Sequence, residues 1–239
     1  MQVQSYASKE CVAKYARLSR NHPKTFLKVF AQILGSVKNK KILDIGCGDG
    51  VNTVALAKKG AHVIGIDLEP LMINKCKVQY NKVKNVEFFL GKAQNLRMFD
   101  PKSFEIVIIN MVLPNIETKK EVQRIFLEIS RVLKNNGKLI FSDINPASLL
   151  SPPTKGRWYT FAKDFNYSKD GSDFTAHVRP DNKTYLTFKD KHWTIPLYLE
   201  CLRKNKMVLT HIMEVNDRPL PKNTKQIPAF IVFGAQKLG

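Results

Sequence analysis

The chain has 239 residues, 44% of them hydrophobic, which suits one globular α/β domain. Its 39 basic residues outnumber its 20 acidic residues, for a net charge of +19. That charge favours anionic partners such as RNA or phospholipid, but a lysine-rich composition produces the same number. Residues 1–43 carry nine basic side chains and one acid, Glu10, yet they lack the interleaved aromatics of single-strand binders. We therefore favour the compositional explanation and expect any nucleic-acid binding to be weak and non-specific.

The cysteines and the N-terminal sequence indicate the compartment in which the protein is expected to function. The four cysteines stand at positions 11, 47, 76 and 201, with no CxxC pair and no histidine cluster. This pattern favours a reduced cytoplasmic protein without structural zinc or another metal. The N-terminus has no apolar core of a secretory leader, and no apolar run reaches the length of a membrane span.

The first predicted elements are helical. Residues 8–20 have a weak helical pattern, and residues 25–37 have a clear one. The apolar residues of one face of the second helix are Phe26, Val29, Phe30, Ile33 and Leu34. We expect a helical cap over 1–37, in which packing explains Tyr6 and Tyr15 more simply than ligand contact does.

The next stretch organises the chain. Residues 41–45 predict a short buried strand that includes one carboxylate, Asp44, and residues 51–59 predict a helix. Between them, every second residue is a glycine: Gly46, Gly48 and Gly50. A strand that runs through a glycine turn into a helix opens a nucleotide-binding βαβ unit, and glycine lets the backbone approach a ligand closely.

The following strand, residues 62–67, ends in Asp67. Such folds place a carboxylate on ribose hydroxyls about 20 residues beyond the turn, which is where Asp67 stands. The turn is not the dinucleotide pattern G-x-G-x-x-G, because position 51 is a valine. No P-loop motif is present either, so triphosphate binding is not expected.

Alternating helices and strands continue this pattern and predict an α/β core over residues 38–145. The expected elements are a helix over 70–80, strands over 86–90 and 104–110, a helix over 118–133 with a Thr118/Glu121 capping box, a turn at 135–137 and a strand over 138–143. The fourth strand is nearly all apolar and is expected to be buried on both faces.

Residues 144–193 interrupt this rhythm with prolines, turn signals and two alternating segments, 174–179 and 184–188. We predict a small antiparallel β lobe inserted on the substrate side. Residues 194–239 then return to a helix over 194–205 and a final strand pair, 207–216 and 229–236. A loop with Pro219 and Pro221 would join that pair.

The stretch from Asp44 to Gly50, followed by Gly65-Ile66-Asp67, resembles motifs I and II of the class I S-adenosylmethionine (SAM) dependent methyltransferases. The resemblance covers residues 40–145 well and the remainder loosely. It implies a Rossmann-like seven-stranded sheet with helices on both faces, an antiparallel last strand pair and the β insertion after strand five. We accordingly expect the whole chain to form a single methyltransferase domain.

The resemblance also implies how SAM is bound. Carbonyls of the glycine turn would accept from the methionine ammonium, and Asp67 would bind the ribose diol. Asp44 would orient the turn or reach the ammonium through water, and a purely structural role is left open. Lys92 replaces the acid that usually binds adenine, so the Ala93 backbone and the Gln94 amide would contact the base. The expected cofactor-binding residues are Asp44, Gly46, Cys47, Gly48, Asp67, Leu68, Met72, Ala93, Gln94, Asn110 and Met111.

The acceptor side is less constrained. The lobe carries both tryptophans and many other rings, which predict a substrate pocket walled by Trp158, Tyr159 and Trp193. A general base is needed only for an acceptor that must lose a proton. His192 is the preferred candidate over His177 and His211, with a structural role as the alternative.

The predicted function is SAM-dependent methyl transfer to a small-molecule acceptor, achieved mainly by proximity and orientation. One alternative is an RNA or protein methyltransferase that uses the basic surface. Another is a catalytically silent binding subunit that kept the fold. The intact Asp44, Gly46, Gly48 and Asp67 oppose that last alternative. The sequence leaves the acceptor and the oligomeric state open.

Overall fold

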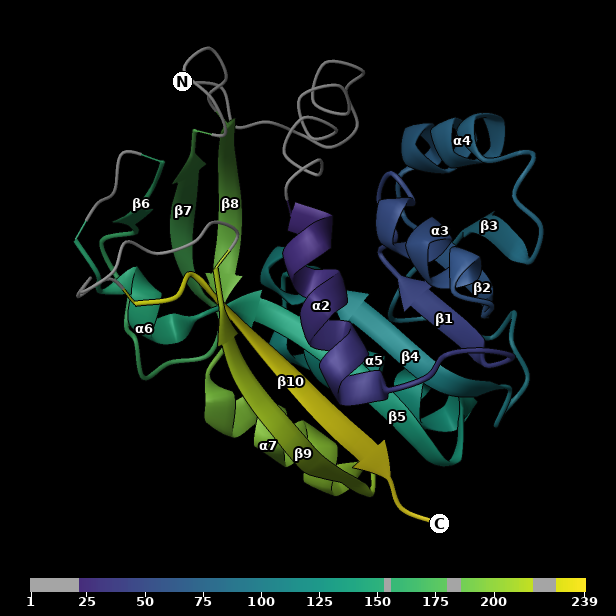
Figure 1. Ribbon diagram of the computed structural model, residues 1–239. Helices are drawn as coiled ribbons and strands as arrows, with labels where there is room; N and C mark the ends of the chain where they lie inside the picture. The colour runs from purple at the N-terminus through teal and green to yellow at the C-terminus, as the bar shows by residue number, and fades with distance from the viewer. Residues whose placement is uncertain (1–21, 153–155, 180–185, 217–226) are drawn as a thin grey trace.

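The computed structural model describes residues 22–152, 156–179, 186–216 and 227–239. They form a three-layer α/β/α body with a small β lobe beside one end of the central sheet (Figure 1). The predicted helix over 8–20, Tyr6, Tyr15 and the loop containing Pro219 and Pro221 lie outside the described residues. The subdivision of the chain into cap, core, lobe and C-terminal part remains a prediction.

The central sheet has seven strands in the order β3-β2-β1-β4-β5-β10-β9. Its strands are β1 Lys41–Ile45, β2 His62–Asp67, β3 Val86–Leu90, β4 Phe104–Asn110, β5 Leu133–Ile144, β9 Met207–Val215 and β10 Phe230–Lys237. The first five pair in parallel, and β10 is antiparallel to both β5 and β9. This arrangement confirms the predicted Rossmann-like sheet and its antiparallel last pair.

Helices cover both faces of the sheet (Figure 1). On one face lie α2 His22–Leu34, α3 Val51–Lys58 and α4 Pro70–Gln79, and on the other lie α5 Lys119–Val132 and α7 Ile195–Lys204. Two short helices, η1 Leu113–Asn115 and α6 Pro146–Leu149, follow β4 and β5. None of the described helices is both long and apolar enough to cross a bilayer.

Each face of the sheet has its own core. On the α5/α7 face, Phe141 stacks on Phe233 with ring centres 4.6 Å apart, and Tyr198 packs against both rings. On the other face, Phe26 of α2 contacts Phe230 of β10. These buried rings fix the helices onto the strands and hold the carboxyl ends of β1, β2, β4 and β5 at one edge of the body.

The lobe is a separate three-stranded antiparallel sheet made of β6 Arg157–Phe161, β7 Ser172–Val178 and β8 Leu186–His192. Its apolar core is small and comprises Phe174, Ala176, Val178, Leu186 and Phe188, which pack with Ile144 and Leu149 of the main body. The inserted antiparallel sheet is therefore confirmed. It has one strand more than the two predicted segments, because β6 is rich in rings but does not alternate.

One local prediction was wrong. Residues 135–137 do not form a turn that precedes the fifth strand, because β5 already begins at Leu133. Leu133 pairs with Phe104 and Lys138 pairs with Ile106, so the extra residues form a bulge opposite Glu105. Asn136 takes the left-handed backbone that asparagine tolerates, with φ at 60°.

Candidate functional site

A cavity of about 350 Å³ opens where the carboxyl ends of β1, β2, β3 and β4 meet η1. This volume falls in the usual range of small-ligand sites, roughly 300–1,000 Å³. Nine predicted cofactor-binding residues line it, namely Gly46, Gly48, Asp67, Leu68, Met72, Ala93, Gln94, Asn110 and Met111. The structure therefore brings together most of the predicted set, while their contact with a cofactor stays a prediction.

The glycine turn forms one wall of the cavity. Gly46 has φ at 69°, and its N–H donates to the Ile66 carbonyl at 2.8 Å, which ties the turn to β2. A Cβ added at Gly46 would lie 2.2 Å from a methyl carbon of Val112 on the opposite wall. Glycine is required here because the backbone is left-handed and the two walls approach each other too closely for any side chain.

Asp67 closes the turn from the end of β2. One of its oxygens accepts from the Gly48 N–H and the other from the Glu69 N–H, both at 2.9 Å. Burial raises the pKa of Asp67, and the two backbone donors oppose that rise. A carboxylate offers about four acceptor positions, so two remain for hydroxyls of a ligand.

Asp44 lies beneath the turn and does not line the cavity. It is 3% exposed and accepts from the Thr53 hydroxyl of α3 at 2.6 Å. Burial raises its pKa to about 7, the Thr53 hydrogen bond lowers it, and the charge of Asp67 raises it further. Asp44 therefore links β1 to α3 through the Thr53 side chain. A structural role would also be served by hydrogen bonds to the amides of the glycine turn, but the bond described here goes to Thr53.

Cys47 also lies outside the cavity, although it was predicted to bind cofactor. Its N–H donates to the Ile66 carbonyl, and its side chain is buried against Val54, Ile73 and Phe88. A hydrogen bond with Cys76 and burial raise the pKa of the Cys47 thiol. Within the described residues, no group of His, Cys, Asp or Glu is arranged to hold a metal ion.

The end of β4 forms a second wall. Ser142 of β5 is fully buried, and its hydroxyl donates to the Asn110 side-chain oxygen at 2.7 Å and accepts from the Met111 N–H at 3.0 Å. Met111 itself has φ at 57°, a left-handed conformation that is unfavourable for a long side chain. The Ser142 contacts thus hold both cavity residues in place at the point where the chain leaves the strand.

The segment after β3 forms a third wall. Gly91, Lys92, Ala93 and Gln94 all line the cavity, and the Gln94 amide donates to Glu121 of α5 at 3.4 Å. The acid expected of the family at position 92 is absent, as the sequence indicated. The carboxylate nearest to the Gln94 side chain therefore comes from α5.

The cavity is acidic although the chain is basic. Its lining includes four carboxylic acids, Asp67, Glu69, Glu117 and Glu121, against one cation, Lys92. Sequence reasoning did not assign Glu117 or Glu121 to the site. The capping box that opens α5 was the available signal, because a helix that follows β4 begins beside the carboxyl ends of the strands.

The three predicted substrate residues do not line this cavity. Trp193 is 1% exposed, and its indole N–H donates to the Leu113 carbonyl of η1 at 2.9 Å. Tyr159 packs edge-on against Phe174 in the lobe core. Trp158 stacks on His177 at 5.2 Å. These contacts are packing within the lobe or between lobe and body, and a role for the three rings in acceptor binding stays a prediction.

His192 is buried at the end of β8 and is absent from the cavity lining. Its Nε2 donates to the Tyr167 carbonyl at 2.8 Å, and its ring stacks on Tyr167. Burial lowers its pKa, which favours the neutral ring at pH 7. Of the other candidates, His177 bonds to Thr160 and His211 to Thr210, both on the surface.

A second group of buried acids lies between the body and the lobe. Asp143 of β5 accepts from the Tyr198 hydroxyl and from the Ile144 N–H. Burial raises the pKa of Asp143 to about 8, and the charge of Asp190 on β8 adds to the rise. Burial likewise raises the pKa of Asp190 to about 7, which Arg157 opposes. Burial therefore favours the protonated form of both carboxyls relative to exposed aspartates.

Comparison with known proteins agrees with this geometry. Residues 43–141 match the family described as "Methyltransferase domain". An arsenite methyltransferase of Halobacterium salinarum is 37% identical over 108 residues, which are 43% of this chain and 27% of that protein. A demethylmenaquinone methyltransferase of Tropheryma whipplei is 28% identical over 122 residues, 51% of this chain and 49% of the relative. The chain thus matches half or less of the length of these relatives.

The fold is shared more widely than the sequence. A Listeria monocytogenes protein described as a putative SAM-dependent methyltransferase superposes with a TM-score of 0.68 at 20% identity. The superposition covers 92% of this chain and 100% of the other. The likeness therefore extends beyond the matched residues 43–141 to the lobe and the C-terminal strands.

Proposed function

We propose that this chain is a class I SAM-dependent methyltransferase that transfers the methyl group of SAM to a small-molecule acceptor. The observation that carries the proposal is the acidic cavity in a chain of net charge +19. Four carboxylic acids around one lysine favour a cationic ligand and disfavour a polyphosphate. SAM carries a sulfonium and an ammonium group and therefore matches this charge.

The individual walls fit the parts of SAM. Gly46 lines the cavity without a side chain and would present its backbone to the methionine end of the ligand. Asp67 has acceptor positions left over for the ribose diol. The Ala93 backbone and the Gln94 amide lie on the wall where the adenine would sit. This assignment takes over the predicted cofactor residues, with Asp44 and Cys47 moved to a supporting layer below the turn.

The chemistry asks little of the chain's own residues. When bound, SAM supplies a methyl group already activated by its positive sulfur. The walls must hold that group in line with the acceptor and keep water away, because most of the rate gain comes from orientation. Asn110 and Met111 are held by Ser142 at the end of β4 and would face the acceptor in this proposal. No acid or base is required unless the acceptor must lose a proton.

A small-molecule acceptor is favoured over RNA by the same charges. An RNA substrate must bring phosphates to the mouth of the cavity, where Glu117, Glu121 and Glu69 would repel them. The names of the two curated relatives, which act on arsenite and on demethylmenaquinone, also support a small acceptor. The acceptor's identity is left to experiment.

Calorimetric titration of the purified chain with SAM and with S-adenosylhomocysteine tests the cofactor. We expect saturable binding of both at one site per chain. A methyl-transfer screen of metabolites against RNA then tests the acceptor, and RNA binding should disappear by physiological salt because each phosphate contact releases counterions. Absence of SAM binding would refute the proposal, and salt-resistant methylation of one RNA would replace its acceptor with RNA.

A further inference from the structure

The segment that joins β3 to β4, residues 91–103, carries a wall of the cavity but contains no helix. Its first four residues line the cavity, and two later ones, Leu96 and Phe99, are buried in the main core. A non-helical segment has few backbone bonds of its own, so its shape must be fixed from outside. The neighbouring helix α5 provides those bonds.

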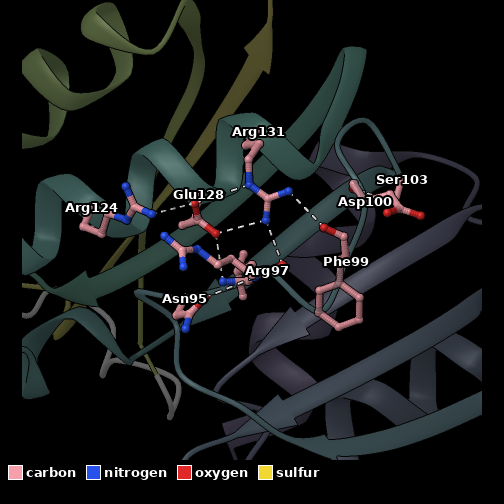
Figure 2. A network of polar contacts seen from close by, with 9 residues as sticks. Asn95, Arg97, Phe99, Asp100, Ser103, Arg124, Glu128 and Arg131 are labelled. Atoms are coloured by element: carbon pink, nitrogen blue, oxygen red, sulfur yellow. Dashed lines mark hydrogen bonds and ion pairs between the residues drawn. The ribbon is translucent and has the colours of Figure 1, made fainter.

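Two α5 side chains, Glu128 and Arg131, bind both backbone polar groups of Leu96, and Figure 2 shows how these two side chains lie together. The Leu96 N–H donates to the Glu128 carboxylate at 2.8 Å, and the Leu96 carbonyl accepts from the Arg131 guanidinium at 2.8 Å. A second Arg131 nitrogen donates to the Phe99 carbonyl at 2.9 Å. The planar, forked guanidinium suits this pair of carbonyls in a way that an ammonium does not.

Glu128 and Arg131 also bind each other. Arg131 approaches both Glu128 oxygens, at 3.0 and 3.3 Å, and Arg124 reaches Glu128 from the previous turn at 3.2 Å. Glu128 is only 2% exposed. Burial opposes its ionisation, but bonds from Arg131 and the Leu96 N–H hold its pKa below the ordinary value. The bonds from Arg131 and the Leu96 N–H thus fix both the charge and the position of the Glu128 carboxylate.

A further contact from α5 lies on the cavity side of Leu96. Gln94 donates to Glu121, which stands two turns before Glu128 on the same helix. Between the two contacts the chain makes a tight turn, in which the Asn95 N–H donates to the Lys92 carbonyl at 3.0 Å. The helix therefore holds both sides of the short stretch that forms the third wall.

We propose that Glu128 and Arg131 are positioning residues, which fix Leu96 and thereby hold Ala93 and Gln94 at the edge of the cofactor's adenine ring. The proposal rests on the proposed function, because it requires the adenine to lie at this wall. Neither residue touches the cavity itself. Their effect should accordingly appear in how well the protein distinguishes one purine base from another.

Substitution of Arg131 by lysine tests the proposal with a close control. R131K keeps a charge beside Glu128 but cannot bind the Leu96 and Phe99 carbonyls together. R124K makes the same change two turns earlier, where Arg124 contacts Glu128 and, among the contacts of the described residues, no backbone group of residues 91–103. Both variants retain the net charge and the helix.

Calorimetry with S-adenosylhomocysteine and with its inosine analogue provides the readout. We expect the native chain to prefer the adenine compound, and R131K to weaken its binding about tenfold, the effect of one hydrogen bond, with a smaller loss for the analogue. R124K should preserve the preference. A folded R131K that keeps the preference, or a native chain that has none, would overturn the proposal.

A second pair of variants guards against simple loss of stability. Glu128→Gln removes the buried charge, and Glu105→Gln is its control. Glu105 likewise accepts a backbone N–H, from Lys41 at 2.8 Å, and a lysine, Lys134 at 2.6 Å, but at the opposite end of β4. Only E128Q should reduce base preference and speed hydrogen exchange of the Leu96 amide. Equal effects of E128Q and E105Q would show that Glu128 and Arg131 only stabilise the fold, and would overturn the proposal. Failure of the native chain to bind S-adenosylhomocysteine would instead refute the proposed function itself.

Discussion

The proposed cofactor half of the molecule, residues 41–121, and the β lobe use their characteristic residues in opposite ways. In the cofactor half, glycines and strand-end acids line a cavity, and most residues predicted from motifs meet there. In the lobe, the aromatic side chains predicted to bind substrate pack against other residues, as the buried indole of Trp193 illustrates. A motif encodes geometry through constraints of short range, whereas an aromatic-rich insertion must first build a core of its own.

Charge separates the two regions as well. The acids of the cofactor half face a cavity, and those between lobe and body, Asp143 and Asp190, are enclosed by protein. The first group can attract a cationic ligand. Protonation of the second group instead affects the free energy of unfolding. Four substitutions test this contrast, and they are taken from the largest expected effect to the smallest.

Gly46→Val should abolish measurable SAM binding. The left-handed backbone disfavours valine, and its Cβ would overlap a Val112 carbon at 2.2 Å, which would close the cavity. Gly35→Val is a matched control, because Gly35 has φ at 68° but no atom within 4 Å of an added Cβ. Calorimetry on both folded variants isolates the clash from the backbone strain. Wild-type binding by G46V would remove the glycine turn from the site.

Asp67→Ala should weaken SAM binding by about 1–3 kcal/mol, the range for a hydrogen bond to a charged group. The variant also loses the acceptors for the Gly48 and Glu69 N–H groups. Asp67→Asn keeps one acceptor oxygen in the same place and should lie between the native chain and D67A. Titration calorimetry measures all three. Unchanged affinity in a folded D67A would refute the assignment of ribose to this carboxylate.

Much of the cofactor half could be predicted from sequence because its signals are local. Strands β2, β3 and β4 have the bounds predicted from the sequence, and Asp67 is the last residue of its strand. Alternation of strands and helices predicts a mainly parallel sheet with right-handed crossovers, whereas the seven-stranded Rossmann-like arrangement was implied by the family resemblance. Depth below the surface is not local, so the sequence could not show that Asp44 and Cys47, both predicted to bind cofactor, lie beneath the residues that line the cavity.

Contacts between distant segments could not be predicted. The steric reason for Gly46 is Val112, a residue on a different strand end, and not the ligand alone. The bonds from α5 to Leu96 join residues 32 and 35 positions apart, and no periodicity marks them. Likewise the β5 bulge arises from pairing with β4, which an isolated Asn-Asn-Gly turn signal does not contain.

Asp143→Asn should change how stability depends on pH. A carboxyl whose pKa is raised by folding gains protons on folding, so the free energy of unfolding falls as pH rises from its unfolded value toward the folded one. For Asp143 that window extends from 3.8 to about 8. The variant removes this loss and should gain on the order of 2–3 kcal/mol on the native chain between pH 5 and pH 7.

Urea denaturation at both pH values measures that difference. Asp173→Asn on β7 serves as the control, because it makes the same chemical change at a side chain that is 60% exposed. Because the comparison is between two pH values, any fixed cost of replacing the oxygen that Tyr198 contacts cancels. Parallel stability curves for the native chain and D143N would show that Asp143 is ionised throughout.

His192→Gln should have the smallest effect on turnover. The variant tests whether the lobe supplies a general base to the reaction. Its Nε2 is committed to the Tyr167 carbonyl, and the ring is 4% exposed, so the histidine has no donor or acceptor directed into the cavity. Glutamine can replace that hydrogen bond but not the stacking on Tyr167, which should cost about 0.5–1.5 kcal/mol of stability. With the acceptor found in the screen, turnover at saturating SAM should change by no more than about twofold, since a general base contributes roughly 10²–10⁴-fold. A loss in that larger range from a stable variant would show that the lobe closes onto the acceptor during reaction and that His192 acts there as the base.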